Sequence, residues 1–259
     1  MKIISLLVFS LFLFSNETLA EDKVIKEINA RNALIKSVSC DVETIIVRRA
    51  VKLTSNGKLY YEKDKNLRLV THAATDNKFM SDVGSNDVYF WVFARRLSPN
   101  YVAYANYKDI YKTNLKPSID PQWMSDCLCL DVIDTSKASI QKQSNKLLVV
   151  QTKTSPRKTT TYKAIAIDPH TGAITGNYLY NSNKQMMAYA KVTSHYTASN
   201  GMKVPKTMET GAPDEDFTIE WTFSNYKFNV NIPIDVFKMP DLQIKRVNLA
   251  TEQLRGLND

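Results

Sequence analysis

The chain changes its hydrophobic period at Ser37-Val38-Ser39-Cys40-Asp41-Val42-Glu43-Thr44. Side chains in this stretch alternate between one apolar and one polar face, and a period of two predicts a half-buried β-strand. The preceding residues, 22–36, instead place Val24, Ile25 and Ile28 near one face of a helix. The sequence therefore predicts one amphipathic helix followed by a region rich in β-strands.

Strand-like runs continue from this stretch at short spacing. We predict further strands over 45–53, 58–63, 67–74, 78–83, 88–95, 101–106, 138–143, 147–153, 160–167, 174–180, 185–196, 203–209 and 217–229. Turn signals separate many of them, among them Asn56-Gly57, Gly84-Ser85-Asn86-Asp87 and Asp168-Pro169-His170-Thr171-Gly172. Consecutive strands with short turns predict an antiparallel meander, and hence a mainly β (α+β) fold.

A short helix is predicted to interrupt the strands at residues 120–130. Asp120 is a favourable N-cap, and Pro121 suits the first helical position. Trp123, Cys127 and Leu130 fall on one stripe of this helix. A small apolar helix is therefore expected in the middle of the sheet.

The first twenty residues are typical of a cleavable secretory signal peptide. Lys2 provides the positive start, residues 3–14 form an apolar run, and Thr18 and Ala20 place small residues before a cut at Glu21. The run is shorter than the about 20 apolar residues of a transmembrane helix. We expect cleavage after Ala20, export from the cytoplasm, and one domain over residues 21–259.

Composition narrows the range of partners. The formal net charge is +8, but the basic residues are scattered, which is typical of a solvated surface and could also favour approach to an anionic membrane. Export, and a sequence without a basic helix or known binding motif, argue against nucleic acid. The three cysteines, Cys40, Cys127 and Cys129, are too few for a disulfide scaffold and leave at least one thiol over.

The predicted strands contain unusually many apolar residues. The run Val88-Tyr89-Phe90-Trp91-Val92-Phe93 is apolar on both faces, and Phe217, Ile219, Trp221 and Phe223 alternate with polar residues. An antiparallel sheet normally exposes one face to water. Either some strands are covered on both sides, or one covered side holds a cavity. The pattern alone favours a well-packed core.

The sequence offers little for catalysis. His72, His170 and His195 lie in predicted strands or in a turn, where a satisfied or surface histidine is the ordinary outcome. Cys127-x-Cys129 lacks the C-x₂-C metal spacing, and no nucleophile elbow, zinc-protease helix or phosphate loop occurs. We predict no enzyme activity, no cofactor and no metal.

Five segments share a family resemblance. They are residues 35–43, 57–69, 81–92, 167–172 and 228–240. In order, they are similar to the first strand, the "GxLwvkrPxxFrW" segment, the "sDGxxlWxY" segment, the "DxxtG" turn and the "n.pi.d..F.mp" ending of the LolA-like lipoprotein-carrier superfamily. Members of that superfamily are periplasmic proteins that ferry lipoproteins between two bacterial membranes. The chain looks closest to the divergent, longer members.

The resemblance implies a strongly curved antiparallel sheet, an incomplete β-barrel with capping helices, that holds acyl chains in an apolar concavity. The matched motifs point six side chains into that concavity: Val38, Cys40, Leu59, Tyr61, Leu67 and Leu69. To these we add four aromatic residues, of which the first three come from a strand whose inward face the pattern does not decide: Phe90, Trp91, Phe93 and Trp123.

Lid contacts are expected from Lys63 and Cys127. Lys63 stands where the carriers have an arginine that contacts the lid helix, and a lysine offers a point charge instead of a planar fork. Cys127 shares a helical stripe with Trp123, so a Cys40–Cys127 disulfide, or one with Cys129, is conceivable in an oxidising compartment. Three unpaired buried thiols are the favoured state.

The expected function is that of a periplasmic lipid-binding carrier, which moves lipid-modified proteins towards the outer membrane. The implied partners are the acyl chains of lipids or lipoproteins, an inner-membrane lipoprotein-export transporter and an outer-membrane acceptor, and we expect a monomer. The alternative is a sensor or regulatory module. RseB-like proteins, which detect lipoprotein or envelope stress, use a LolA-like domain in this way but add a second domain.

Overall fold

The computed structural model describes residues 22–63, 66–95, 101–113, 120–143, 145–154 and 160–251. The predicted signal peptide over residues 1–20 lies outside these ranges. Within them, no helix is long and apolar enough to cross a membrane.

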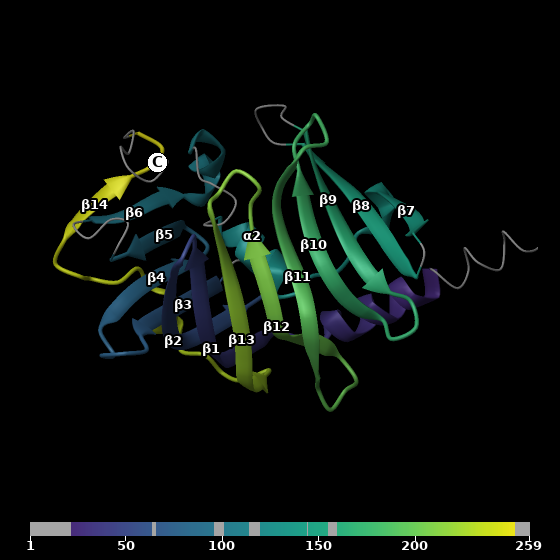
Figure 1. Ribbon diagram of the computed structural model, residues 1–259, viewed down its shortest axis with the longest axis horizontal. Helices are drawn as coiled ribbons and strands as arrows, with labels where there is room; N and C mark the ends of the chain where they lie inside the picture. Colours follow the sequence, from purple (N-terminus) through teal and green to yellow (C-terminus); the bar gives the residue numbers. More distant parts are fainter. Residues whose placement is uncertain are drawn as a thin grey trace, which may run out of the picture.

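The described residues build one sheet of fourteen strands, in the order β14-β6-β5-β4-β3-β2-β1-β13-β12-β11-β10-β9-β8-β7 (Figure 1). Neighbours are antiparallel except β14 and β6, which are parallel. The mainly β prediction is confirmed. The strands are β1 (Ser37–Arg48), β2 (Val51–Glu62), β3 (Asn66–Ala73), β4 (Phe79–Ser85), β5 (Tyr89–Ala94), β6 (Tyr101–Asn106), β7 (Ala138–Gln143), β8 (Lys146–Thr154), β9 (Thr160–Asp168), β10 (Ala173–Tyr180), β11 (Met186–Thr197), β12 (Lys203–Gly211), β13 (Phe217–Phe228) and β14 (Lys245–Asn248).

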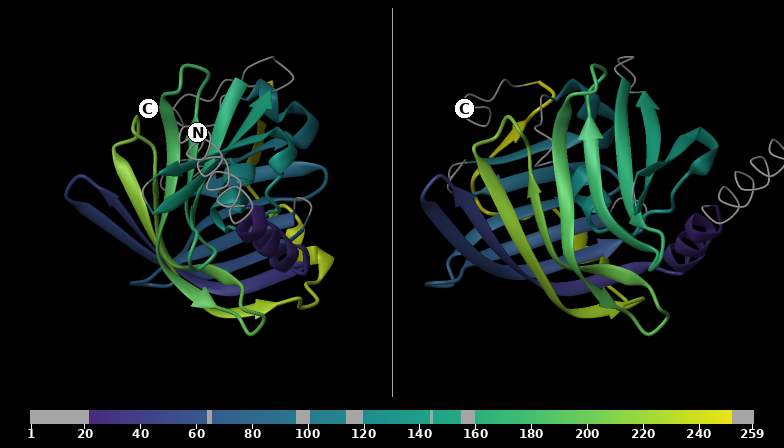
Figure 2. Two further views of the ribbon diagram at one scale, coloured as in Figure 1. Left: turned by 90° about the vertical axis from the view of Figure 1, so that its right-hand side faces the viewer. Right: turned by 45° about the vertical axis from the view of Figure 1, so that its right-hand side comes forward.

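Strand twist makes this sheet curve strongly around its helices, and the end strands β14 and β7 do not pair with each other (Figure 2). The result is an incomplete barrel. We call the face that α2 covers the inner face and the opposite one the outer face.

The β1–β2 hairpin corrects two predictions. The predicted strand 45–53 runs across a turn, since Arg49 has a φ of 53° and β2 begins at Val51. The predicted turn at Asn56-Gly57 lies inside β2 instead. Gly57 is needed there for space: a Cβ atom would lie 2.0 Å from the carbonyl oxygen of Val70 on β3.

The strand β14 was not predicted. Its four residues pair with β6, from Lys245 with Tyr101 to Asn248 with Tyr104. The segment before it, which includes the 3₁₀-helix η4 (Ile234–Phe237), runs along the outer face of β3 to β6 and contributes Met239, Leu242 and Ile244 to the apolar cluster there. The C-terminal part of the chain therefore covers one face of the sheet and extends its edge.

The predicted N-terminal helix is confirmed over residues 22–33. Ile25 and Ile28 are buried and pack with Leu147, Ile165 and Ile167 of β8 and β9, which places the helix across that end of the sheet (Figure 2). Asn32 lies on the same side, and its amide donates to the carbonyls of Cys129 and Asp131.

The helix α2 (Pro121–Cys127) is the predicted mid-chain helix. The Asp120 carboxylate accepts a hydrogen bond from the Gln122 backbone at 2.8 Å, as expected of an N-cap. The helix ends three residues before the predicted end, and Cys129 has a positive φ of 60°, a common way to leave a helix. Two further 3₁₀-helices flank this region: η1 (Tyr107–Lys112) and η3 (Thr135–Lys137).

Candidate functional site

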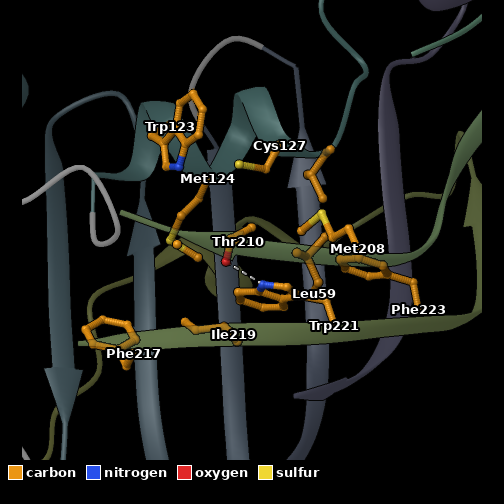
Figure 3. Close-up of a pocket in the computed structure, with 12 residues that line it drawn as sticks. Leu59, Trp123, Met124, Cys127, Met208, Thr210, Phe217, Ile219, Trp221 and Phe223 are labelled. Atoms are coloured by element: carbon orange, nitrogen blue, oxygen red, sulfur yellow. Dashed lines mark hydrogen bonds between the residues drawn. The ribbon is translucent and has the colours of Figure 1, made fainter. Parts of the chain in front are cut away.

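A cavity lies between α2 and the inner face of the sheet (Figure 3). In the close-up, Met124 points from α2 towards the side chains of β12 and β13, and Trp123 and Cys127 lie beside it at the level of the helix. The lining residues are Leu59, Trp123, Met124, Cys127, Leu128, Met208, Thr210, Gly211, Phe217, Ile219, Trp221 and Phe223. Strands β2, β12 and β13 thus form the floor, and α2 forms the roof.

The wall of the cavity is apolar. Among the described residues that line it, none carries a charge. The indole nitrogen of Trp221 donates to the Thr210 hydroxyl at 2.8 Å, so these two polar groups satisfy one another. The cavity has a volume of about 30 Å³, enough for no more than a few atoms. A larger apolar ligand would enter only if α2 moved away from the sheet.

Strand β13 supplies a row of aromatic side chains to the floor. The rings of Trp221 and Phe223 are stacked, with 6.1 Å between their centroids and an angle of 2° between their planes. The centroid of the Phe223 ring lies 6.2 Å from that of Tyr226. Phe217, Ile219 and Trp221 are partly buried, whereas Phe223 is fully buried. The floor therefore continues along β13 from the covered interior towards the turn between β12 and β13.

Polar contacts hold the C-terminal end of α2 and the residues after it. The buried Asn177 of β10 donates to the Asp126 carbonyl at 3.0 Å and contacts the Cys129 sulfur at 3.4 Å. Asn29 both donates to and accepts from the backbone of Ile133. Trp123 and Met124, in the first half of α2, instead meet the sheet through apolar side chains. The C-terminal end of the roof is thus bonded to β10, and the segment after it to the N-terminal helix.

The structure brings most predicted site residues together. Leu59 and Trp123, with the predicted lid residue Cys127, line the cavity. Five others are buried in the same apolar cluster without lining it: Val38, Cys40, Tyr61, Leu67 and Leu69. Phe90 is fully buried, and its pairing with Ser85, itself opposite Leu67, places it on the inner face.

Two predicted cavity residues belong to the other face. Trp91 and Phe93 pack in a separate cluster with Val102, beneath the C-terminal segment. Because side chains alternate along a strand, the inward placement of Phe90 requires Trp91 to point outward. Trp91 and Phe93 therefore do not line the cavity, and that part of the prediction is wrong.

Several lining residues were not predicted as site residues. They are Met124, Leu128, Met208, Thr210, Gly211, Phe217, Ile219, Trp221 and Phe223. The alternation of Phe217, Ile219, Trp221 and Phe223 was visible in the sequence and was the available signal. Nothing in it indicated that this strand, paired with β1, would lie under α2.

The predicted lid residue Lys63 lies just after β2. Burial raises the pKa of the Asp131 carboxyl group, in the segment that follows α2, and the charge of Lys63 offsets a part of this rise. Lys63 therefore lies close enough to this segment to influence it electrostatically. Its role as a lid contact remains a prediction.

The three cysteines are buried free thiols, which is the favoured expectation. Burial, with a contribution from Asp41, raises the pKa of Cys40 to about 12, and burial raises the pKa of Cys129 to about 12 as well. Since the thiolate is the reactive form, these cysteines stay unreactive while the region remains closed.

The histidines have ordinary structural roles. His195 hydrogen-bonds the Ile174 carbonyl at 2.9 Å, and His72 contacts the ring of Phe79 edge-on. Across the described ranges, no group of His, Cys, Asp and Glu side chains has the arrangement of a metal site.

Comparison with solved structures identifies the fold. A protein of the LolA superfamily from Nitrosomonas europaea superposes with a TM-score of 0.54 at 9% identity, over 83% of this chain and 97% of the other. The chain has a LolA-like fold. No protein-family model matches the sequence, and no curated protein sequence matches it either.

Two further structures with this LolA-like fold are similar. A domain from Vibrio parahaemolyticus, described as an outer membrane lipoprotein-sorting protein domain, has a TM-score of 0.57 at 13% identity and covers 84% of this chain and 97% of its own. A DUF1329 family protein from Desulfovibrio piger has a TM-score of 0.55 at 11% identity and covers 83% and 95%. At such identities the likeness shows the fold alone.

Proposed function

We propose that this protein is a lipid-binding carrier that holds acyl chains in the cavity beneath α2. The observation that carries the proposal is the wall of that cavity, which is built from aliphatic, aromatic and sulfur-containing side chains and whose one hydroxyl group, on Thr210, is already bonded to Trp221. Such a wall favours a ligand that needs apolar contact and no specific polar partner.

Acyl chains match these requirements. Each methylene group that leaves water contributes about 0.8 kcal/mol, so even part of one chain binds usefully through burial alone. Met124 and Met208, which face the cavity, are flexible side chains that adapt to irregular apolar ligands. The small present volume describes the closed state, and a bound chain would widen the space between α2 and the sheet.

The cargo we propose is a lipid-modified protein on its way to the outer membrane. The LolA-like fold supports this, since similar structures include a lipoprotein-sorting domain. The signal-like residues 1–20 support a periplasmic location for a single domain over residues 21–259. An inner-membrane transporter and an outer-membrane acceptor would then be its partners. The protein would act as a carrier and not as an enzyme.

A fluorescent fatty-acid probe tests the proposal. Wild-type protein should bind the probe with a saturable rise in fluorescence. Ile219→Glu places a carboxylate on the cavity floor, where desolvation of a charge is costly, and should lose binding. Ile219 is partly buried, so the fold should tolerate the change. Ile234→Glu is the matched control, because Ile234 is 66% exposed on η4, and it should bind like the wild type.

Two outcomes would contradict the proposal. The first is a wild-type protein that does not bind the probe. The second is an Ile219→Glu variant that stays folded and binds as well as the Ile234→Glu control. If the probe binds, mass spectrometry of material purified from the periplasm should find lipid or lipoprotein acyl chains. Recovery of a membrane-anchored signalling protein without acyl chains would instead favour the sensor alternative.

A further inference from the structure

A buried charged cluster joins the roof of the cavity to the sheet. The Lys163 ammonium group of β9 lies 2.8 Å from the Asp126 carboxylate, at the end of α2, and 4.0 Å from the Asp131 carboxylate. The side chains of Lys163 and Asp126 are only 17% and 14% exposed, whereas the side chain of Asp131 is 36% exposed. The Gln122 amide also donates to Asp126 at 3.3 Å. The cluster thus contains two carboxylates and one ammonium group.

We propose that Lys163 is the positioning residue that keeps α2 closed over the cavity. It does so by binding Asp126 and Asp131 at the C-terminal end of the roof. The strength of this hold depends on whether Asp131 is protonated. Lys163 would hold α2 in this way whatever ligand the cavity binds.

The geometry explains why a lysine is needed at this place. The apolar contacts of Trp123 and Met124 are non-directional, so they do not by themselves fix the helix in one position. The Lys163–Asp126 pair is directional and largely shielded from water, where removal of one partner leaves an uncompensated charge. Without Lys163, two carboxylates would face each other at the end of α2.

The charges of three residues, together with burial, act on the Asp131 carboxyl group. Burial, and Asp126 of α2 through a hydrogen bond and its charge, raise the pKa of Asp131 to about 7, although Lys163 of β9 and Lys63 after β2 act to lower it. Lys163 stays charged, because the carboxylates of Asp126 and Asp131 outweigh the effect of burial, which alone would lower its pKa.

The direction of the pH effect follows from linkage. In the closed state Asp131 binds its proton more tightly than an exposed aspartate, whose pKa is about 4. Protonated Asp131 therefore favours closure, and this contribution is lost as the pH rises from about 4 through about 7. With Asp131 neutral, Lys163 and Asp126 balance one to one. With Asp131 charged, the cluster carries an excess negative charge and α2 is held less tightly.

Hydrogen exchange measured by mass spectrometry tests the role of Lys163. In Lys163→Met, amides of residues 122–130 should exchange at least tenfold faster than in the wild type, while those of β1 and β2 keep their rates. Lys163→Arg keeps the charge and should restore most of the protection. The control is Lys78→Met, which breaks an exposed pair with Asp76 and should change neither region.

Two results would overturn the role of Lys163. One is unchanged exchange at residues 122–130. The other is equal acceleration there and in β1 and β2, which would mean that Lys163 only stabilises the whole fold.

The pH profile supplies a second test, which does not depend on the folding of Lys163→Met. The exchange rate of residues 122–130 in the wild type is divided at each pH by the rate in Asp131→Asn, so that intrinsic exchange chemistry cancels. This ratio should rise at least fivefold between pH 5 and pH 7 and level off above pH 7. A ratio that stays constant from pH 5 to pH 8.5 would overturn the dependence on Asp131.

Discussion

The two coverings of the sheet are built differently. On the outer face, the C-terminal segment is bonded along its length: Arg68 donates to the Val236 carbonyl, Asn86 donates to the Phe237 carbonyl, and β14 joins the edge of the sheet. On the inner face, the seven-residue α2 is bonded to β10 at its C-terminal end and encloses a cavity.

This difference shows that similar apolar strand faces can become a core or a site. Beneath the C-terminal segment, Trp91 is fully buried and packs so tightly that a Cβ atom on Gly84 would lie 2.3 Å from its ring. Beneath α2, Trp221 keeps one side towards open space. The segment that covers an apolar strand face, and the bonds that hold this segment, therefore decide whether the face becomes packed core or lines a cavity.

The largest loss of stability is expected from a substitution of the buried, charged Asp82 on the outer face. Asp82 is fully buried and accepts hydrogen bonds from Arg68 and from the Trp91 indole. Asp82→Ala leaves the Arg68 guanidinium without a carboxylate partner and should lower the free energy of unfolding by about 4 kcal/mol, measured by urea titration. Asp216→Ala, at an exposed pair with Arg48, should leave it unchanged. An Asp82→Ala variant as stable as the wild type would contradict the packed outer face.

Two tryptophan substitutions compare the faces directly. Trp91→Ala opens a hole in a packed cluster and should cost about 3 kcal/mol of unfolding free energy. Trp221→Ala removes a partly exposed ring that borders a cavity, and should cost about 1 kcal/mol. Urea titration of both variants checks the difference. Equal losses would mean that the inner face is packed like the outer one.

A smaller loss of stability is expected when the hydrogen bond between β10 and the C-terminal end of α2 is removed. Asn177→Ala removes a buried donor to the partly buried Asp126 carbonyl, which keeps its bond from the Cys129 backbone, and should cost about 1 kcal/mol of unfolding free energy. Asn183→Ala, in the exposed β10–β11 turn, should have no measurable effect in the same urea titration. If both variants have the unfolding free energy of the wild type, the hydrogen bond from Asn177 does not stabilise the closed position of α2.

No effect is expected from a reductant. Because Cys40, Cys127 and Cys129 are free thiols, a thiol reagent in denaturant should count three, and reductant should leave the unfolding midpoint unchanged. A count of one, with a lower midpoint after reduction, would reveal a disulfide between two of these cysteines.

Local patterns predicted much of the fold. Alternation located the strands, and the Asp120-Pro121 start located α2, because both depend on neighbouring residues. The pair Asn56-Gly57 led to the wrong prediction of a turn. Its glycine is needed because the backbone of β3 passes so close at Val70 that a side chain would not fit. Strand β14 was missed because its four residues are strand-like only beside β6.

The candidate site was harder to predict than the strands. In β5 both faces are apolar, so periodicity could not separate Phe90 from Trp91 and Phe93, and the choice depends on what the C-terminal segment covers. The buried Lys163–Asp126 pair joins residues 37 positions apart, and no local pattern marks it. Long-range contacts of this kind decide where the cavity lies.

The most direct test of the account uses the three tryptophans of the chain. Trp123 and Trp221 line the cavity, whereas Trp91 lies on the outer face. A fatty acid with a brominated chain quenches tryptophan rings that it contacts. In Trp91→Phe, which keeps the two cavity tryptophans, we predict strong, saturable quenching. In the double variant Trp123→Phe/Trp221→Phe, which keeps Trp91, we predict none. Quenching of Trp91 alone, or no quenching in either protein, would contradict an acyl-binding cavity beneath α2.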